Sequence, residues 1–206
     1  VVGQELAQVA KEFGTPRRTV LLASAGAPVA QRAPLEVPDA PCWVLLSGSG
    51  LVARTDSLGE LAPEGRSAHD VVVAKVKTTA QGEFGVLTNR GRLLRCPAIE
   101  LHTVPLTASA PNLQGGSLAH ELWPLEPGER PLGLTTLSPE SRGLALGTRR
   151  GVVKRVNPEL LGKDAWDVIR LDDGDELVGA VELTDDAADL AFITTDAQLL
   201  HFPAAS

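Results

Sequence analysis

The sequence predicts an all-β protein made of propeller-like, four-stranded blades, about four of them, preceded by a short helix. Three observations support this prediction. A hairpin-like segment recurs four times, a second marker recurs at the same interval, and apolar residues alternate along the hairpin arms. Repeats of about 40–50 residues that contain several short strands are typical of propeller blades. Because one blade cannot cover both faces of its own sheet, neighbouring blades are expected to stack.

The helix is predicted by the first dozen residues. Their apolar positions fall at heptad-like spacing, at Val2, Leu6, Val9 and Phe13. Gly14 follows as a C-terminal cap. The chain contains no Met, so we expect it to be a piece of a longer protein in which this helix continues an upstream one. Residues 27–40 are rich in Pro and Ala and predict a linker or an irregular entry to the first blade.

The hairpins align without gaps on a small hydroxyl residue that is followed three positions later by Gly. The four segments are WVLLSGSGLVART (43–55), FGVLTNRGRLLRC (84–96), LALGTRRGVVKRV (144–156) and LAFITTDAQLLHF (190–202). The hydroxyl residues are Ser47, Thr88, Thr148 and Thr194, and the following positions hold Gly50, Gly91, Gly151 and, as a departure, Ala197. Gly at this place predicts a tight turn that needs a positive φ.

The second marker is a Gly-acid turn that leads into a strand. LEPGERPLGLTTL (125–137) matches LDDGDELVGAVEL (171–183), and their offset of 46 equals the offset from Thr148 to Thr194. Each unit is therefore interpreted as a strand, a turn and then the hairpin. A weaker copy, VVVAKVKTT (71–79), precedes the second hairpin. Extra length around residues 103–116 predicts a long loop.

Composition limits the function classes. The formal net charge is −7 and the pI is about 5.1, which argues against nucleic acid unless a local basic surface outweighs it within a Debye length of about 8–10 Å. Cys42 and Cys96 lack a metal-binding or redox spacing, and we expect buried, reduced thiols of a cytosolic protein. No apolar run approaches the ~18 residues of a membrane span.

Three stretches of the chain resemble a known family. ELAQVAKEFGTPRRT (5–19) resembles the end of the coiled coil in the DNA-cleaving subunit of bacterial type IIA topoisomerases, and LALGTRRGVVKRV and residues 169–186 resemble repeats of its C-terminal domain. The resemblance implies that residues 1–19 end a coiled coil and lead into a β-pinwheel over residues 20–206. In a β-pinwheel the blades exchange strands with their neighbours, and the outer rim binds and bends DNA.

The resemblance also distinguishes two branches of the family. DNA gyrase A carries a Gln-Arg-Arg-Gly-Gly-Lys-Gly box after the first hairpin, whereas the corresponding loop here, residues 56–70, matches it only at Gly65 and Arg66. This favours the equivalent subunit of topoisomerase IV, or a gyrase relative that has lost DNA wrapping. The implied partners are double-stranded DNA, the ATPase subunit of the enzyme, and the catalytic core that cleaves DNA. The implied location is the bacterial cytoplasm, at the nucleoid.

No catalytic residue is predicted in this chain. The family's cleavage step needs a tyrosine nucleophile, and the chain has no Tyr. It also lacks a P-loop, so ATP and Mg²⁺ would belong to the parent enzyme and no cofactor is expected here. The acidic run at residues 172–176 does not match an EF-hand, and we expect a solvated turn and no metal. The four His residues show no paired spacing for a metal or a catalytic base.

The candidate DNA-binding residues are cations at equivalent points of the repeat. They lie at hairpin tips and exits, and they are Arg54, Arg90, Arg92, Arg95, Arg149, Arg150, Lys154 and Arg155. Cations along one rim can follow a bent phosphate backbone without reading bases. The alternative is that these cations are solvated strand ends. Lys75 and Lys77 could lie on any exposed strand face, and the fourth unit, where His201 replaces the exit Arg, is expected to contribute little.

The tryptophans Trp43, Trp123 and Trp166 are interpreted as blade packing, because their sequence neighbours are apolar or acidic rather than basic.

Two functions remain open at this point. The first is a DNA-binding, DNA-bending domain that positions duplex DNA for strand passage by a topoisomerase, more topoisomerase IV-like than gyrase-like. The second is a propeller-type protein-interaction scaffold without DNA binding, which the net charge of −7 favours.

Overall fold

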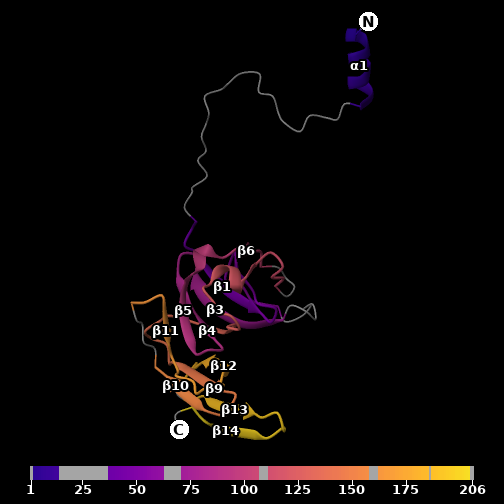
Figure 1. The fold of residues 1–206 in the computed structure, drawn as a ribbon. Helices are drawn as coiled ribbons and strands as arrows, with labels where there is room; N and C mark the ends of the chain where they lie inside the picture. Colours follow the sequence, from indigo (N-terminus) through magenta and orange to yellow (C-terminus); the bar gives the residue numbers. More distant parts are fainter. Residues whose placement is uncertain are drawn as a thin grey trace. The chain divides into compact units, whose positions relative to one another are not determined.

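The computed structural model describes residues 2–13, 37–62, 71–106, 111–157, 162–185 and 187–204. The chain divides into two units, residues 1–35 and 36–206. The described part of the first unit is the helix α1 (Val2–Phe13; Figure 1), as predicted, and none of its residues is buried. Gly14, the lead-in to Thr19 and residues 27–36 of the expected linker lie outside the described residues.

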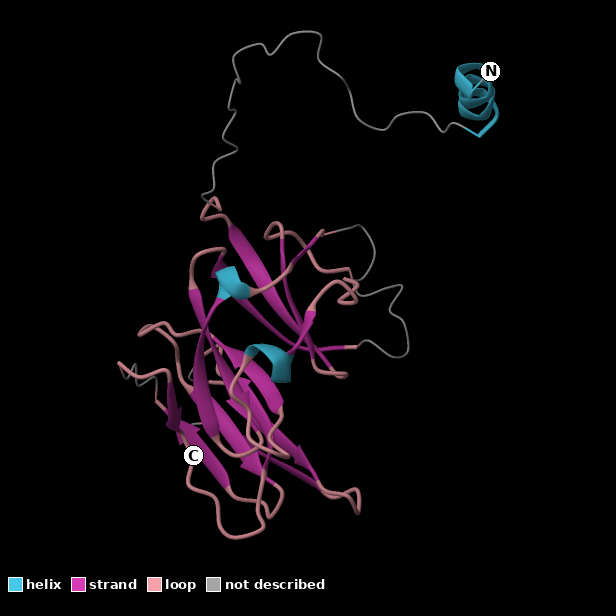
Figure 2. Ribbon diagram, turned by 45° about the horizontal axis from the view of Figure 1, so that its top comes forward, coloured by secondary structure: helices cyan, strands magenta, loops and turns pink. Residues whose placement is uncertain are grey.

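The second unit is mostly β, with four sheets among its described residues (Figure 1). The first sheet contains β1 (Pro41–Ser47), β2 (Leu51–Thr55), β3 (Val72–Thr79), β6 (Thr103–Val104) and β7 (Ser117–Leu118). The second contains β4 (Glu83–Thr88), β5 (Arg92–Pro97), β8 (Pro131–Thr135) and β11 (Ala165–Asp167). The third contains β9 (Leu144–Thr148), β10 (Val153–Val156) and β12 (Leu177–Glu182), and the fourth β13 (Asp189–Ile193) and β14 (Leu199–Pro203). A 3₁₀ turn (Ala98–Glu100) and the short helix α2 (Ala119–Leu122) complete the unit, and Figure 2 shows them in cyan among the strands.

The four predicted hairpins are confirmed, as β1–β2, β4–β5, β9–β10 and β13–β14. In each turn the amide of the fourth residue donates to the carbonyl of the hydroxyl residue, at 3.0 Å in all four. The φ angles of Gly50, Gly91 and Gly151 are +84°, +75° and +85°, and Ala197 adopts +62°. The repeat therefore places Gly where a left-handed conformation is required, and Ala197 adopts that conformation with a side chain.

The blades differ from the predicted unit of strand, turn and hairpin. The strand that precedes a hairpin pairs instead with the hairpin before it: β3 with β1, β8 with β4 and β12 with β9. The short strands β7 and β11, which follow the next hairpin along the chain, pair with β2 and β5. Neighbouring blades thus exchange strands. The sequence repeat has the right period, but it carries no information about which neighbour a strand joins.

The hydrophobic core lies in layers between successive sheets, which confirms the predicted stacking. One cluster joins Val44 and Leu46 of β1 to Phe84 and Val86 of β4, and Trp123 packs against it edge-to-face, 6.2 Å from Phe84. A second cluster joins the second and third sheets, through residues such as Leu87, Leu93, Leu144 and Leu146. A smaller one joins β9 to the fourth hairpin. Apolar faces on both sides of a sheet make each blade depend on its neighbours.

Both cysteines are free and buried, as expected. Burial raises the pKa of the Cys42 thiol, and it raises the pKa of Cys96 to about 12. In the described part of the chain, no helix is long and apolar enough to cross a membrane.

Candidate nucleic-acid interface

The tip of the second hairpin is held by the acidic turn at residues 126–129. Thr88 Oγ1 donates to Glu129 Oε1 at 2.7 Å, and Arg92 Nη1 donates to Glu129 Oε2 at 2.7 Å. The Glu129 side chain is fully buried. A buried carboxylate needs such charged and hydrogen-bonding partners to offset its desolvation. The two sequence markers, hairpin and Gly-acid turn, are therefore parts of one contact.

The third hairpin repeats this contact with residues 172–176. Asp175 lies 46 positions after Glu129 and occupies the equivalent place: it accepts a hydrogen bond from the Thr148 hydroxyl and one from the Arg150 amide, the latter at 3.1 Å. Burial acts to raise the pKa of Asp175, but these bonds, the Glu176 amide and the charge of Arg150 lower it overall. The expectation of a solvated turn holds only in part. Asp172 and Asp173 are exposed, whereas Asp175 and Glu176 bind the hairpin tip.

Most of the predicted arginines have carboxylate partners. Arg90 pairs with Glu126 and also donates to the Pro127 carbonyl at 2.6 Å. Arg95 pairs with Glu83, and Arg149 with Glu176, each at 3.1 Å. Some of these partners are distant in the sequence: Glu129, the partner of Arg92, lies 37 positions after it. Three of these cations, Arg90, Arg92 and Arg149, are called the tip arginines below.

The tip arginines differ in exposure. The side chains of Arg149 and Arg90 are 68% and 44% exposed, and that of Arg92 is 22% exposed. An exposed ion pair contributes at most about 1 kcal/mol. Arg149 and Arg90 can therefore exchange a carboxylate for a phosphate at small cost, whereas Arg92 is tied to the buried Glu129.

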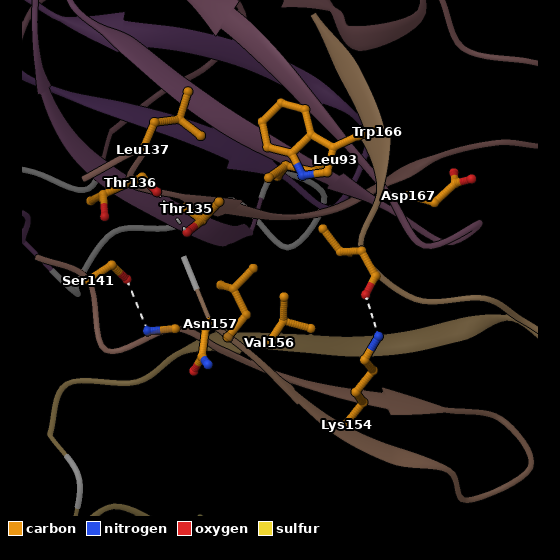
Figure 3. A pocket seen from close by; sticks show the side chains of 13 residues that line it. Leu93, Thr135, Thr136, Leu137, Ser141, Lys154, Val156, Asn157, Trp166 and Asp167 are labelled. Atoms are coloured by element: carbon orange, nitrogen blue, oxygen red, sulfur yellow. Dashed lines mark hydrogen bonds between the residues drawn. The ribbon is translucent and has the colours of Figure 1, made fainter. Parts of the chain in front are cut away.

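The remaining predicted cations lie in different surroundings. Arg54 on β2 is half-buried, and its Nε is a buried atom with no hydrogen-bond partner among the described residues. Arg155 donates to the Arg142 carbonyl at 3.2 Å. Lys154 lines a cavity of about 250 Å³ between the second and third sheets, and its Nζ donates to the Val168 carbonyl at 2.9 Å (Figure 3). The repeat places these cations at hairpin exits, yet their partners differ from blade to blade.

The first sheet carries a cationic group that the candidate set omits. Trp43 on β1 lies directly opposite Lys77 on β3, and Lys75 lies opposite Leu45. The Nζ atoms of Lys75 and Lys77 are 5.2 and 5.0 Å from the centroid of the Trp43 ring. Trp43 packs against a buried cluster that includes Leu45 and Ala53, as interpreted from the sequence. Its sequence neighbours are not basic, but two of its spatial neighbours are lysines. The alternation of lysines in residues 71–79 is the signal that locates them on one face.

The fourth hairpin and the histidines offer no further cationic site in the described residues. Thr194 Oγ1 bonds to Asp196 within its own turn, and His201 lies 3.3 Å from Asp189. Among the described residues, no cluster of His, Cys, Asp or Glu has the composition to hold a metal ion.

Comparison with known proteins relates this architecture to the topoisomerases. DNA gyrase A from Helicobacter pylori is 27% identical over 220 residues, which cover 98% of this chain and 25% of the relative. Its Chlamydia muridarum counterpart is 23% identical with the same coverage. The chain is similar in sequence to DNA gyrase A over nearly its whole length. It spans about a quarter of the length of these curated relatives, and no family model matches it.

The fold agrees with solved structures of topoisomerase C-terminal domains. The C-terminal domain of DNA topoisomerase IV superposes with a TM-score of 0.62 at 22% identity, covering 82% of this chain and 53% of that one. The Escherichia coli ParC C-terminal domain gives 0.57 at 21% identity, covering 81% and 66%. The expected all-β pinwheel fold is thereby confirmed, and the expected short helix lies at the N-terminal end of the sequence.

Proposed function

We propose that this chain is a DNA-binding and DNA-bending domain that positions duplex DNA for strand passage by a type IIA topoisomerase. The similarity to gyrase A over 98% of the chain carries the proposal. The cations that recur at hairpin tips and exits supply the chemistry, because guanidinium and ammonium groups bind phosphate oxygens without reading bases. Bending a site of about 20–30 bp costs on the order of 1–6 kcal/mol, so several such contacts are required.

Within this proposal the parent enzyme is of the topoisomerase IV type rather than a supercoiling gyrase. The support is the loop at residues 56–70, whose sequence does not form the gyrase box; Gly65 and Arg66, its faint match, lie outside the described residues. The chain has no Tyr and no P-loop, so DNA cleavage and ATP hydrolysis with Mg²⁺ belong to the catalytic core and to the ATPase subunit. The place of action is the cytoplasm, at the nucleoid.

The tip of the third hairpin provides the test. In the Arg149→Glu/Arg150→Glu variant, both exposed cations are reversed, and we expect affinity for a duplex of moderate length to fall at least about tenfold at low salt. DNA bending, followed by energy transfer between dyes at the duplex ends, should fall with it. Lys11→Glu/Lys163→Glu is the matched control, since it reverses two exposed lysines outside the candidate set. Equal losses in both variants, or no change in either, would contradict the proposed interface.

A second candidate, a protein-interaction scaffold, is favoured by one observation. Carboxylates neutralise the tip arginines in a chain whose net charge is −7. If the wild-type chain binds no duplex even at about 10 mM salt, where phosphate contacts are strongest, the scaffold replaces the DNA-binding domain.

A further inference from the structure

The side of β3 that faces away from the second sheet carries two exposed lysines. Along this strand Val73, Lys75 and Lys77 are exposed, while the alternating Ala74 and Val76 face the core between the first two sheets. Lys75 and Lys77 therefore project from the same side of the sheet as Trp43, their cross-strand neighbour on β1. These two residues are called the lysine pair below.

Trp43 is held in place and fixes the position of the lysine pair. The indole Nε1 of Trp43 donates to the Gly59 carbonyl at 2.9 Å, and the Trp43 backbone amide donates to Thr55 Oγ1 at 2.9 Å. Both ammonium groups then lie within about 5 Å of the ring centroid, inside the range of a cation–π interaction. An ammonium group held in this way keeps N–H donors for a ligand, and its stem loses less freedom when the ligand binds.

Among the described residues, no carboxylate neutralises the lysine pair. None lies within 4.0 Å of either Nζ in this part of the chain, whereas the tip arginines each meet a glutamate. The chain has 26 acidic and only 19 basic residues, so acidic partners are plentiful. Two exposed lysines that contact a ring, and no acidic residue of the described structure, are therefore suited to bind an anion. An incoming anion then has no carboxylate from the described residues to displace.

We propose that Lys75, Lys77 and Trp43 form a preorganised contact for the DNA phosphodiester backbone on the first blade, separate from the hairpin tips. This inference rests on the proposed function, because duplex DNA is the source of the phosphates. The two ammonium groups donate to phosphate oxygens, and the indole ring positions them. The contact strengthens binding for every sequence alike, since it reaches no base edge.

The salt dependence of binding by the full 206-residue chain tests the contact. Each phosphate contact contributes about −0.9 to the slope of log K against log salt, so Lys75→Gln/Lys77→Gln should reduce the slope by about 2 and weaken binding roughly tenfold or more at about 0.1 M salt. Lys11→Gln/Lys163→Gln removes the same charge without touching an aromatic ring and should leave the slope nearly unchanged. Equal slope changes in the two variants would overturn the contact.

A second variant separates the role of the ring from that of charge. Trp43→Phe keeps an aromatic residue and the net charge but weakens the cation–π interaction, so affinity should fall about two- to fivefold with an unchanged slope. Tryptophan fluorescence should change when DNA is added to wild type, and this change should be lost in Trp43→Phe.

If the chain binds DNA through Arg149 and Arg150 but its affinity does not change when Lys75 and Lys77 are replaced, only the contact is refuted. A wild-type chain that binds no duplex would refute both the contact and the proposed function.

Discussion

The tip arginines lie at or beside hairpin turns and the lysine pair lies on a strand, and the two cationic groups are held by opposite kinds of partner. At the hairpin tips, Glu126, Glu129 and Glu176 bind the guanidinium groups and cancel their charge locally. On β3, an indole ring holds the ammonium groups and leaves their charge intact. A count of cations at a surface is therefore a poor measure of its affinity for phosphate. The charge that remains after internal pairing is what a ligand meets.

The largest expected effect is a loss of folding stability when the buried partner of a tip arginine is removed. Glu129→Ala leaves Arg92 and the Thr88 hydroxyl without their buried acceptor, and we expect the free energy of unfolding in urea to fall by about 3–5 kcal/mol. Glu126→Ala is the control on the same turn, because its carboxylate is 56% exposed. A loss below about 1 kcal/mol for Glu129→Ala would show that the turn does not hold the tip.

A smaller effect concerns Glu176, the partly buried carboxylate at the third hairpin. Glu176→Gln keeps an oxygen acceptor for Asn89 but removes the negative charge beside Arg149. We expect DNA affinity at low salt to rise about fivefold, equivalent to about 1 kcal/mol, and the gain to shrink at high salt. Glu140→Gln removes an exposed charge that pairs with no arginine in the described residues, and it should change affinity less. Unchanged affinity in Glu176→Gln would mean that the pair does not compete with phosphate.

The smallest expected effect on stability completes the comparison. Lys75→Gln/Lys77→Gln should lower the free energy of unfolding by less than about 2 kcal/mol, since exposed cation–π contacts contribute roughly 0.5–1 kcal/mol each. The same variant should lose DNA affinity strongly, whereas Glu129→Ala loses stability strongly. Thermal and urea unfolding of the two proteins measure this contrast. A lysine variant as unstable as Glu129→Ala would make the pair a structural element.

The sequence predicts the turns better than their surroundings. Positive φ at Gly50, Gly91 and Gly151 follows from a local requirement of the chain, and local requirements are visible in a repeat. The partners of Arg92 and Lys77 are not local: Glu129 and Trp43 are more than 30 positions away and are brought near by strand pairing. The repeat does not reveal the exchange of β3, β8 and β12 between blades for the same reason. Pairing between neighbours is decided by tertiary packing rather than by spacing.

The salt dependence of duplex binding by the wild-type chain tests the central claim most directly. If the exposed tip arginines and the lysine pair together hold the phosphate backbone, log K should fall against log salt with a slope of about −4 or steeper, which corresponds to roughly four or more phosphate contacts. A slope shallower than about −1, or no binding at about 50 mM salt, would contradict the claim that this domain holds DNA through its charged rim.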